Sequence, residues 1–283
     1  MNLRELIKVG TKILSNAGID NSKNESKMLL CHVKGITNSE LFLKWDEEAC
    51  EDVEGEFLKL INERKNRRPI QHILKTQEFM GMEFYVDENV LIPRRETEEI
   101  VEIAIDIIKK KNEDVHVLDL CTGSGAIGVS VAKLTNAKVT CSDISKDAMM
   151  IAKQNGKRNF VSDKIAYINS DLFEKISKSF DVIISNPPYI ESIEIGKLQS
   201  EVKDFEPIMA LDGGEDGLCF YRRIVKDSYE HLNDGGFILL EIGYDQGKEL
   251  IEMMISDGRY TNIKVVKDFS KNDRIVVAEK GEA

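Results

Sequence analysis

Apolar residues recur at steps of three and four over residues 1 to about 70, a pattern typical of amphipathic helices. Gly18 ends the first pattern, and Asn21 and Ser22 begin a second. Thr37 and Glu40 have the spacing of a capping box that begins a third helix. A fourth, highly charged helix is predicted from an apolar stripe at Val53, Phe57, Leu60 and Ile61. We therefore predict that residues 1–72 form a small helical bundle.

Residues 73–92 differ in character from the helical region before them. The stretch from Phe79 to Val86 predicts a β-hairpin that turns near Gly81, and we assign residues 73–92 as a hairpin linker. Pro93 and the acidic residues after it are typical of a helix start. A helix is therefore predicted from Pro93 to about Lys111.

From residue 115 onward, short apolar runs alternate with helical patterns. Strands are predicted at 115–120, 137–143, 165–168, 180–185, 236–242, 263–266 and 274–278, and helices at 126–134, 146–155, 217–232 and 246–256. This alternation predicts an α/β domain over residues 93–283, with a mostly parallel sheet covered by helices on both faces. No regular element is predicted for 190–216, and a long loop beside a ligand site is more often functional than structural.

Composition and charge narrow the class of protein. The chain of 283 residues carries a net charge of −11, which lowers the expectation of direct nucleic-acid binding. It lacks a run of about 20 apolar residues, so no membrane contact is expected, and without a signal-peptide core a cytoplasmic location follows. The cysteines form no CxxC pair and the histidines no metal-ligand spacing, so we expect reduced thiols and no metal site.

Glycine and acidic residues follow the predicted strands, at the edge where parallel sheets bind ligands. The stretch from Asp119 to Gly125 joins a strand to a helix, and its glycines allow a ligand close to the backbone. Asp143 ends the next strand, where a carboxylate can accept hydrogen bonds from ribose hydroxyls. Asp171 and Leu172 follow a third strand, where they can bracket an adenine ring. The turn lacks a P-loop lysine, and its acidic neighbours suit a positively charged sulfonium ligand.

Each of these residues also has a purely structural interpretation. Asp143 can cap the following helix, Asp171 can form an Asx-turn, and Leu172 can be a core residue. Suitable groups at the ends of several strands together favour the ligand site.

The tetrapeptide Asn186-Pro187-Pro188-Tyr189 follows the predicted buried strand 180–185. Asn186 offers a side-chain oxygen and Pro187 a backbone carbonyl, which together can accept two N–H bonds from a planar NH2 group. The two prolines restrict the backbone, so these acceptors are held in place before a substrate arrives. Tyr189 supplies an aromatic face. The alternative is a proline-rich turn that merely ends a strand.

Further stretches make the pattern more specific: Leu91 to Arg94 with Thr97 and Glu98, then Glu206-Pro207, Ala210-Leu211, Gly213-Gly214 and Asp216 to Leu218. Together with Asp119 to Gly125, Asp143 and Asn186 to Tyr189, they resemble the PrmC (HemK) family of peptide chain release factor glutamine methyltransferases. The resemblance covers nearly the whole chain. The tetrapeptide alone is shared with DNA adenine methyltransferases.

The resemblance implies a class I, Rossmann-like methyltransferase with a mostly parallel seven-stranded sheet. It implies S-adenosyl-L-methionine as cofactor, with S-adenosyl-L-homocysteine as product, bound by Cys121, Thr122, Gly123, Ser124, Gly125, Asp143, Leu172 and Asn186. Asn186, Pro187, Pro188 and Tyr189 would bind the substrate, with Asn186, Pro187 and Tyr189 as catalytic residues. The substrate would be the glutamine of a Gly-Gly-Gln tripeptide in release factors, which the helical domain would contact.

Two positions depart from the family pattern. Cys121 stands where many members have glycine, so we expect no glycine-only backbone conformation there. Leu172 stands where some members have an aromatic residue, which predicts weaker packing on adenine.

Three alternatives remain at this stage. The same tetrapeptide could grip the amino group of a flipped adenine in a nucleic-acid N6-methyltransferase. A related enzyme could methylate a glutamine of a ribosomal protein. A third alternative, an inactive fold that serves as an interaction module, is disfavoured because both halves of the predicted site are intact.

Overall fold

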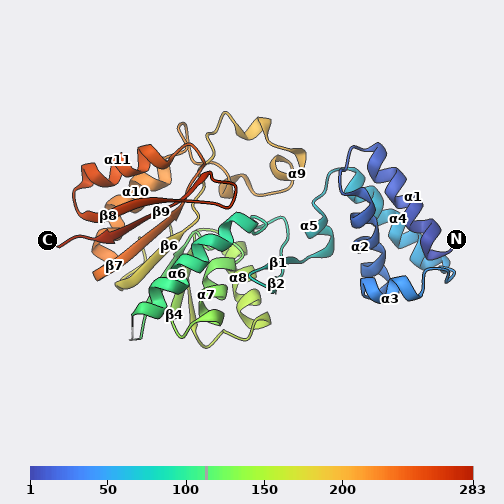
Figure 1. Cartoon of the computed structure of the whole chain (residues 1–283), viewed down its shortest axis with the longest axis horizontal. Helices are drawn as coiled ribbons and strands as arrows, with labels where there is room; N and C mark the ends of the chain where they lie inside the picture. Colours follow the sequence, from blue (N-terminus) through green and yellow to red (C-terminus); the bar gives the residue numbers. More distant parts are fainter. Residues whose placement is uncertain (112–113, 283) are drawn as a thin grey trace. The chain divides into compact units, whose positions relative to one another are not determined.

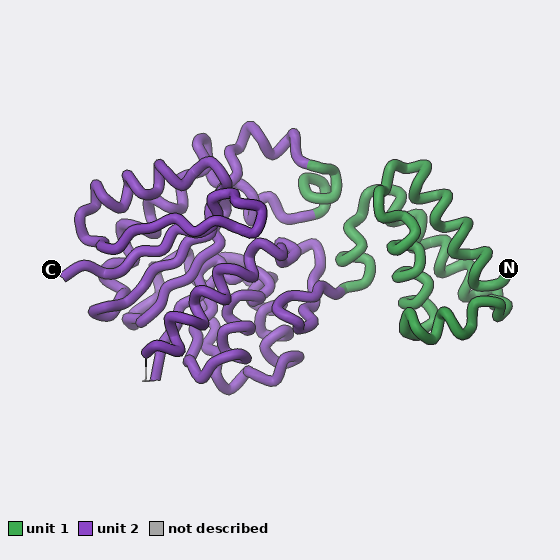
Figure 2. Tube along the Cα trace, viewed as in Figure 1, with its two compact units in different colours: residues 1–75, 199–205 green, residues 76–198, 206–283 purple. Residues whose placement is uncertain are grey.

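The computed structural model describes residues 1–111 and 114–282 and divides the chain into two compact units. Unit 1 comprises residues 1–75 and 199–205, and unit 2 comprises residues 76–198 and 206–283 (Figure 2). A short segment of the long loop after residue 189 therefore groups with the amino-terminal helices.

Unit 1 is a helical bundle, with helices α1 (Leu3–Asn16), α2 (Ser22–Lys34), α3 (Asn38–Leu43), α4 (Glu51–Lys65) and α5 (Ile70–Leu74). The capping box predicted at Thr37 and Glu40 is present at the start of α3. Leu3, Leu6 and Phe57 are among the buried residues of its core. A Cβ at Gly10 would lie 2.7 Å from the Phe57 ring, so α1 packs on α4 at a distance only glycine permits.

A buried ion cluster holds the inserted segment within unit 1. This segment contains α9 (Ser200–Lys203), and Glu201 forms ion pairs of 3.1 Å with both Arg64 and Arg67. Arg64 also pairs with Glu25 at 2.6 Å, and its side chain is only 8% exposed. The buried Arg64 guanidinium is thus neutralised by two carboxylates, Glu25 and Glu201, which lie far apart in the sequence.

Unit 2 begins with the predicted hairpin, formed by β1 (Gln77–Phe79) and β2 (Met82–Phe84). The predicted helix start at Pro93 is wrong, because Arg94 is extended and a 3-10 turn, Arg95–Thr97, precedes α6 (Glu98–Lys110). Arg94 instead forms an ion pair with Glu206, and this long-range contact outweighs the local helix signal.

The core of unit 2 is one seven-stranded sheet with the order β5-β4-β3-β6-β7-β9-β8 (Figure 1). Its strands are β3 (His116–Leu120), β4 (Lys138–Asp143), β5 (Ile165–Asn169), β6 (Phe180–Ser185), β7 (Leu232–Glu241), β8 (Tyr260–Lys267) and β9 (Asp273–Lys280). Strands β3 to β7 pair in parallel, whereas β9 is antiparallel to β7 and β8. The predicted mostly parallel α/β sheet is confirmed.

Helices cover both faces of this sheet. They include α7 (Ala126–Leu134), α8 (Lys146–Arg158), α10 (Cys219–Ser228) and α11 (Gly247–Asp257). Neighbouring residues of β6 alternate: Val182 and Ile184 pack in a cluster with α6 and α7, and Ile183 packs in a cluster with α10 and α11. This two-sided burial explains why the strands are continuous apolar runs in the sequence.

The loop between β6 and α10 contains short helical turns that the sequence did not predict. They are Ile195–Lys197, α9 and Ile208–Ala210. The predicted helix 217–232 is shorter than expected, because α10 ends at Ser228, a 3-10 turn follows, and β7 begins at Leu232. Within the described residues, no helix is long and apolar enough to cross a membrane.

Candidate active site

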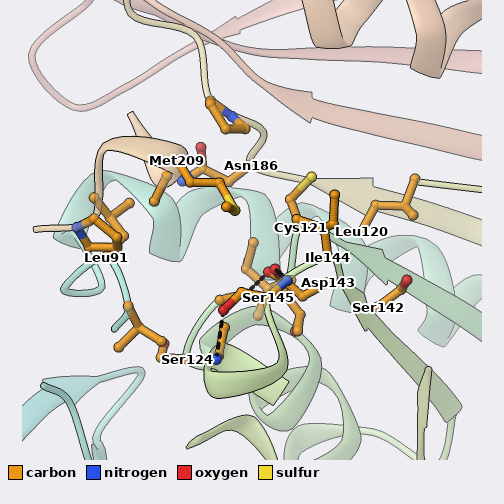
Figure 3. A pocket seen from close by; sticks show the side chains of 18 of the residues that line it. Leu91, Leu120, Cys121, Ser124, Ser142, Asp143, Ile144, Ser145, Asn186 and Met209 are labelled. Atoms are coloured by element: carbon orange, nitrogen blue, oxygen red, sulfur yellow. Dashed lines mark hydrogen bonds between the residues drawn. The ribbon is translucent and has the colours of Figure 1, made fainter. Parts of the chain in front are cut away.

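A cavity of about 370 Å³ opens at the carboxyl ends of β3, β4 and β6 in unit 2. Figure 3 shows that Cys121, Asp143 and Asn186, which follow or end these three strands, surround the same space. Of the cofactor and substrate residues predicted from the sequence, nine line the cavity: Cys121, Thr122, Gly123, Ser124, Asp143, Asp171, Leu172, Asn186 and Pro188. Gly125, Pro187 and Tyr189 are not among its lining residues.

The loop after β3 is wound around the buried carboxylate of Asp119. One carboxylate oxygen of Asp119 accepts hydrogen bonds from the Thr122 hydroxyl and, at 2.9 Å, from the Gly128 backbone nitrogen. Complete burial raises the pKa of Asp119 to about 7 despite these donors. A Cβ at Gly123 would meet no atom within 4 Å, so this glycine leaves room for a ligand against the backbone.

The backbone at Cys121 corrects one expectation. Cys121 has a φ of +57°, in the left-handed region that favours glycine. A non-glycine residue there costs about 1 kcal/mol or more. The position therefore does use a conformation suited to glycine. Gly123 and Gly125 have φ values of +52° and +81° in the same loop.

Asp143 connects the β3 loop to the turn after β4. Its Oδ2 accepts from the Gly123 nitrogen and its Oδ1 from the Ser145 nitrogen, each at 2.9 Å. The cap of α8 is Ser145, whose hydroxyl accepts from the Ala148 nitrogen, so Asp143 does not serve as that helix cap. Burial raises the pKa of Asp143. The carboxylate is thus fixed at the cavity wall by two backbone donors.

Asp171 and Leu172 lie where the third parallel strand leaves the sheet. Asp171 forms an ion pair of 2.9 Å with Arg223, and both residues line the cavity. Leu172 is 5% exposed and packs in the hydrophobic core while one side of it faces the cavity. Leu172 is therefore both a core residue and a residue of the cavity wall.

Asn186 brings a polar amide to the cavity at the end of β6. Its Nδ2 donates a hydrogen bond of 3.4 Å to the hydroxyl of Thr97. Within the described part of the chain, neither Asn186 Oδ1 nor the Pro187 carbonyl accepts a hydrogen bond from another residue. Asn186 lines the cavity, so its Oδ1 is available to an external donor there, whereas Pro187 is buried and does not line the cavity.

The aromatic ring of Tyr189 packs against the core on the α10–α11 face of the sheet. Burial raises its pKa to about 12. The Tyr189 carbonyl accepts from Nε2 of Gln246 at 3.0 Å. A Cβ at Gly213 would lie 2.7 Å from the Tyr189 Cα, and one at Gly217 would lie 2.4 Å from the Tyr189 oxygen. The glycines at positions 213 and 217, at the end of the loop, therefore allow this segment to pack closely on the tetrapeptide.

Sequence reasoning assigned no role to three residues beside the cavity. The Thr97 hydroxyl accepts a hydrogen bond from the Asn186 side-chain amide. Glu206 forms an ion pair with Arg94 through both of its carboxylate oxygens. Glu241 ends β7 with a side chain that is 2% exposed, and burial raises its pKa to about 7. Its one sequence signal is an acidic residue directly after the apolar run from Phe237 to Leu240.

Comparison with known proteins agrees with this architecture. The family described as Methyltransferase small domain matches residues 100–201, and the PrmC N-terminal domain matches residues 5–74. The crystal structure of a methyltransferase from Pyrococcus furiosus superposes with a TM-score of 0.54 at 21% identity, over 78% of this chain and 100% of that one. The fold and the cavity at the strand ends define a class I methyltransferase, a class whose methyl donor is S-adenosylmethionine.

Relatives along the whole chain define the family. A release factor glutamine methyltransferase of Clostridium acetobutylicum is 40% identical over 99% of both chains. A second, from Clostridium botulinum, is 37% identical over 99% of this chain and all of the relative. The chain belongs to the family of release factor glutamine methyltransferases.

Proposed function

We propose that this enzyme transfers a methyl group from S-adenosylmethionine to the side-chain amide nitrogen of the glutamine in the Gly-Gly-Gln motif of peptide chain release factors. The observation that carries the proposal is that Asn186 lines the cavity directly after β6, and that neither its Oδ1 nor the adjacent Pro187 carbonyl accepts a hydrogen bond from a described residue. Family membership supports a protein glutamine as the substrate.

Cys121 to Gly125, Asp143, Leu172 and Asn186 would hold the cofactor. The Gly123 backbone leaves space for a ligand, and the fixed carboxylate of Asp143 provides an acceptor for hydroxyl groups. Two acidic residues at the wall, Asp143 and Asp171, suit a ligand without phosphates that carries a positive sulfur. When bound, this cofactor supplies an electrophilic methyl group.

The chain's own residues would orient and activate the substrate nitrogen. An amide nitrogen is a poor nucleophile because its lone pair is delocalised into the carbonyl group. Asn186 Oδ1 and the Pro187 carbonyl accept its two N–H bonds, which fixes the nitrogen in one orientation. These acceptors also stabilise the positive charge that develops on nitrogen, so they act most strongly in the transition state. The proton then leaves to solvent.

Pro188 and Tyr189 complete the proposed substrate grip. Pro188 lines the cavity directly. Gln246 and the glycines at positions 213 and 217 hold the backbone of Tyr189 in place. Tyr189 would contribute through this fixed backbone. Its ring would contribute if substrate binding brings it to the amide. The ring packs against the core, so a stacking role requires it to move.

The helical domain, residues 1–72, would contact the release factor, with the hairpin linker 73–92 joining it to the methyltransferase domain, residues 93–283. Release factors act in translation, so the proposal includes a cytoplasmic location and a protein partner. We propose no direct contact with nucleic acid or membrane.

The decisive experiment is mass spectrometry of purified release factor after incubation with enzyme and S-adenosylmethionine. We expect a mass gain of one methyl group on the glutamine of the Gly-Gly-Gln tripeptide. A release factor with that glutamine changed to alanine should gain nothing. Parallel reactions with ribosomal protein and with adenine-containing DNA test the two alternative substrates, and methylation of either one in place of release factor would overturn the proposal.

A further inference from the structure

Glu241 lies beside Asn186 although the two are far apart in sequence. Strands β6 and β7 are parallel, and Ser185 pairs with Leu240 in their register. Asn186 directly follows β6 and Glu241 is the last residue of β7, so the two residues lie at the same edge of the sheet, one strand apart. Glu241 is also held from the other side, since it pairs with Ile275 of β9.

The side chains of Asn186, Thr97 and Glu241 form a small polar cluster. The Asn186 Nδ2 donates to the Thr97 hydroxyl, and the side chains of both residues act to lower the pKa of the Glu241 carboxyl group. Thr97 is 4% exposed and Glu241 is 2% exposed, so water does not compete with these contacts. Within the described residues, the second carboxyl oxygen of Glu241 has no hydrogen-bond partner.

This cluster distinguishes the two orientations of the Asn186 amide. A side-chain amide has a donor end and an acceptor end, and rotation by half a turn exchanges them. The ionised carboxyl group of Glu241 is an acceptor only, so in this form it favours the orientation in which Nδ2 faces Glu241 and Thr97. Rotation would place Oδ1 against the carboxylate oxygen, with two acceptors in contact and the buried carboxylate short of a donor. The favoured orientation leaves Oδ1 for the cavity.

Other charged groups face Glu241 from each neighbouring element. Arg274 of β9 stabilises its ionised form, whereas Glu96 before α6 opposes it. The charge of Glu241 contributes to the raised pKa of both Tyr189 and Tyr221. The Tyr221 hydroxyl donates a hydrogen bond to the Glu241 backbone oxygen at 2.7 Å. Arg274 is also paired with Asp268.

We propose that Glu241 is a positioning residue, which through Thr97 and Nδ2 of Asn186 keeps the Asn186 oxygen directed at the substrate amide. This inference rests on the proposed function for its kinetic consequence. Its structural content, the fixed orientation of the Asn186 amide, is independent of the substrate.

The kinetic test is a double-mutant cycle between Glu241→Ala and Asn186→Ala, measured as single turnovers on release factor. Glu241→Ala should lower the methyl-transfer rate about 10-fold or more, as loss of an orienting partner does, while affinity for S-adenosylmethionine changes less than about twofold. In the Asn186→Ala background, Glu241→Ala should cause no further loss. Additive losses would overturn the proposal, as would a Glu241→Ala rate within about twofold of the unmodified enzyme.

A matched control separates positioning from general stability. Glu99 is another buried acid in unit 2, 9% exposed, and it accepts from the Phe269 nitrogen at 2.9 Å. Glu99→Ala should lower the melting temperature without lowering the methyl-transfer rate. If Glu99→Ala and Glu241→Ala lower the rate equally, Glu241 has no special role. Glu241→Gln, which retains an acceptor oxygen and the side-chain volume, should recover part of the rate.

A second measurement does not depend on catalysis. The side-chain NH2 protons of Asn186, assigned by their disappearance in Asn186→Ala, should exchange slowly with solvent in the unmodified protein. They should exchange at least several-fold faster in Glu241→Gln and in Thr97→Val. Equal exchange in all three proteins would overturn the proposal even if methyl transfer is found. Failure of the unmodified enzyme to methylate release factor, with slow exchange intact, would overturn the proposed function alone.

Discussion

Both carboxylate oxygens of Glu206 accept hydrogen bonds from the Nη2 atom of Arg94, at 2.7 and 2.8 Å. The Glu206 side chain is 2% exposed, and its neighbours Pro207, Met209 and Ala210 line the cavity. This ion pair therefore joins the segment before α6 to the returning end of the long loop. The structure thus brings into contact two stretches that lie far apart in the sequence.

Replacing Arg94 by methionine should leave Glu206 buried without its partner. Burial already raises the pKa of Glu206, and Arg94 is the main group that opposes this shift. We expect the free energy of unfolding to fall by about 2–4 kcal/mol, measured by urea denaturation, with weaker cofactor binding. The double variant Arg94→Met with Glu206→Met should recover part of the loss. A change below about 0.5 kcal/mol would show that the pair is not structurally important.

Replacing Asn186 by alanine tests the substrate grip. One acceptor for the substrate amide is removed, so turnover should fall by roughly 100-fold or more, as for loss of one charge-stabilising contact elsewhere. Affinity for S-adenosylmethionine, measured by calorimetry, should fall only modestly, because Asn186 is one of several residues proposed to hold the cofactor. A near-normal single-turnover rate would remove Asn186 from the mechanism.

The stability of the protein should depend on pH through Glu241. Burial raises the pKa of Glu241 from 4.5 to about 7, so the folded state holds a proton that the unfolded state releases. The stabilising contribution of this group is therefore complete below pH 4.5 and is lost progressively as the pH rises to about 7.

Comparison with Glu241→Gln isolates this effect, because Asp119, whose pKa is also raised to about 7, is present in both proteins. The unfolding free energy of Glu241→Gln relative to the unmodified protein should rise by about 3 kcal/mol between pH 4.5 and 7, since each unit of pKa shift corresponds to about 1.4 kcal/mol. Denaturation at a series of pH values measures the difference. A difference that stays constant with pH would show that Glu241 titrates normally.

Replacing Gly213 by alanine should displace the tetrapeptide. The new Cβ would lie 2.7 Å from the Tyr189 Cα, which is backbone and cannot rotate away. We expect a stability loss of about 1–3 kcal/mol and a reduced methyl-transfer rate, because the Pro187 and Asn186 oxygens shift.

Gly55→Ala is the matched control for this substitution. Gly55 lies inside α4, where a Cβ meets no atom within 4 Å, so alanine should stabilise the protein by about 0.5–1 kcal/mol. Unchanged activity in Gly213→Ala would contradict the close contact with Tyr189.

The ion cluster of unit 1 should govern the mobility of residues 199–205. Glu201→Gln weakens the pairs with Arg64 and Arg67, so backbone amides of this segment should exchange with deuterium several-fold faster. Mass spectrometry of peptides covering the segment measures the rate. Glu194→Gln, which removes an exposed pair with Lys197, is the control and should leave exchange nearly unchanged.

Much of the fold follows from local sequence patterns. The strands of unit 2 are buried on both faces, so they appear as apolar runs, and residues at their carboxyl ends meet at one edge. This is why Asp143 and Asn186 could be placed at the same site from sequence alone. The capping box at Thr37 is likewise a local signal, and the structure contains it.

The features that sequence did not predict depend on distant contacts. Pro93 suggested a helix start, but Arg94 is kept extended by Glu206, which lies more than a hundred residues later. The role of Glu241 is visible only when the register of β6 and β7 is known. The short turns of the long loop have three or four residues each, too few for a periodic pattern.

The grouping of residues 199–205 with the amino-terminal helices has a practical consequence for fragments of this protein. A fragment that begins at residue 76 looks like a complete methyltransferase domain in a linear map, yet it would carry Glu201 without Arg64 and Arg67. The polypeptide between the substrate tetrapeptide and Glu206 would then lack its ordinary anchor. Poor catalysis by such a truncated enzyme would reflect a loosened loop as well as the loss of the amino-terminal helices.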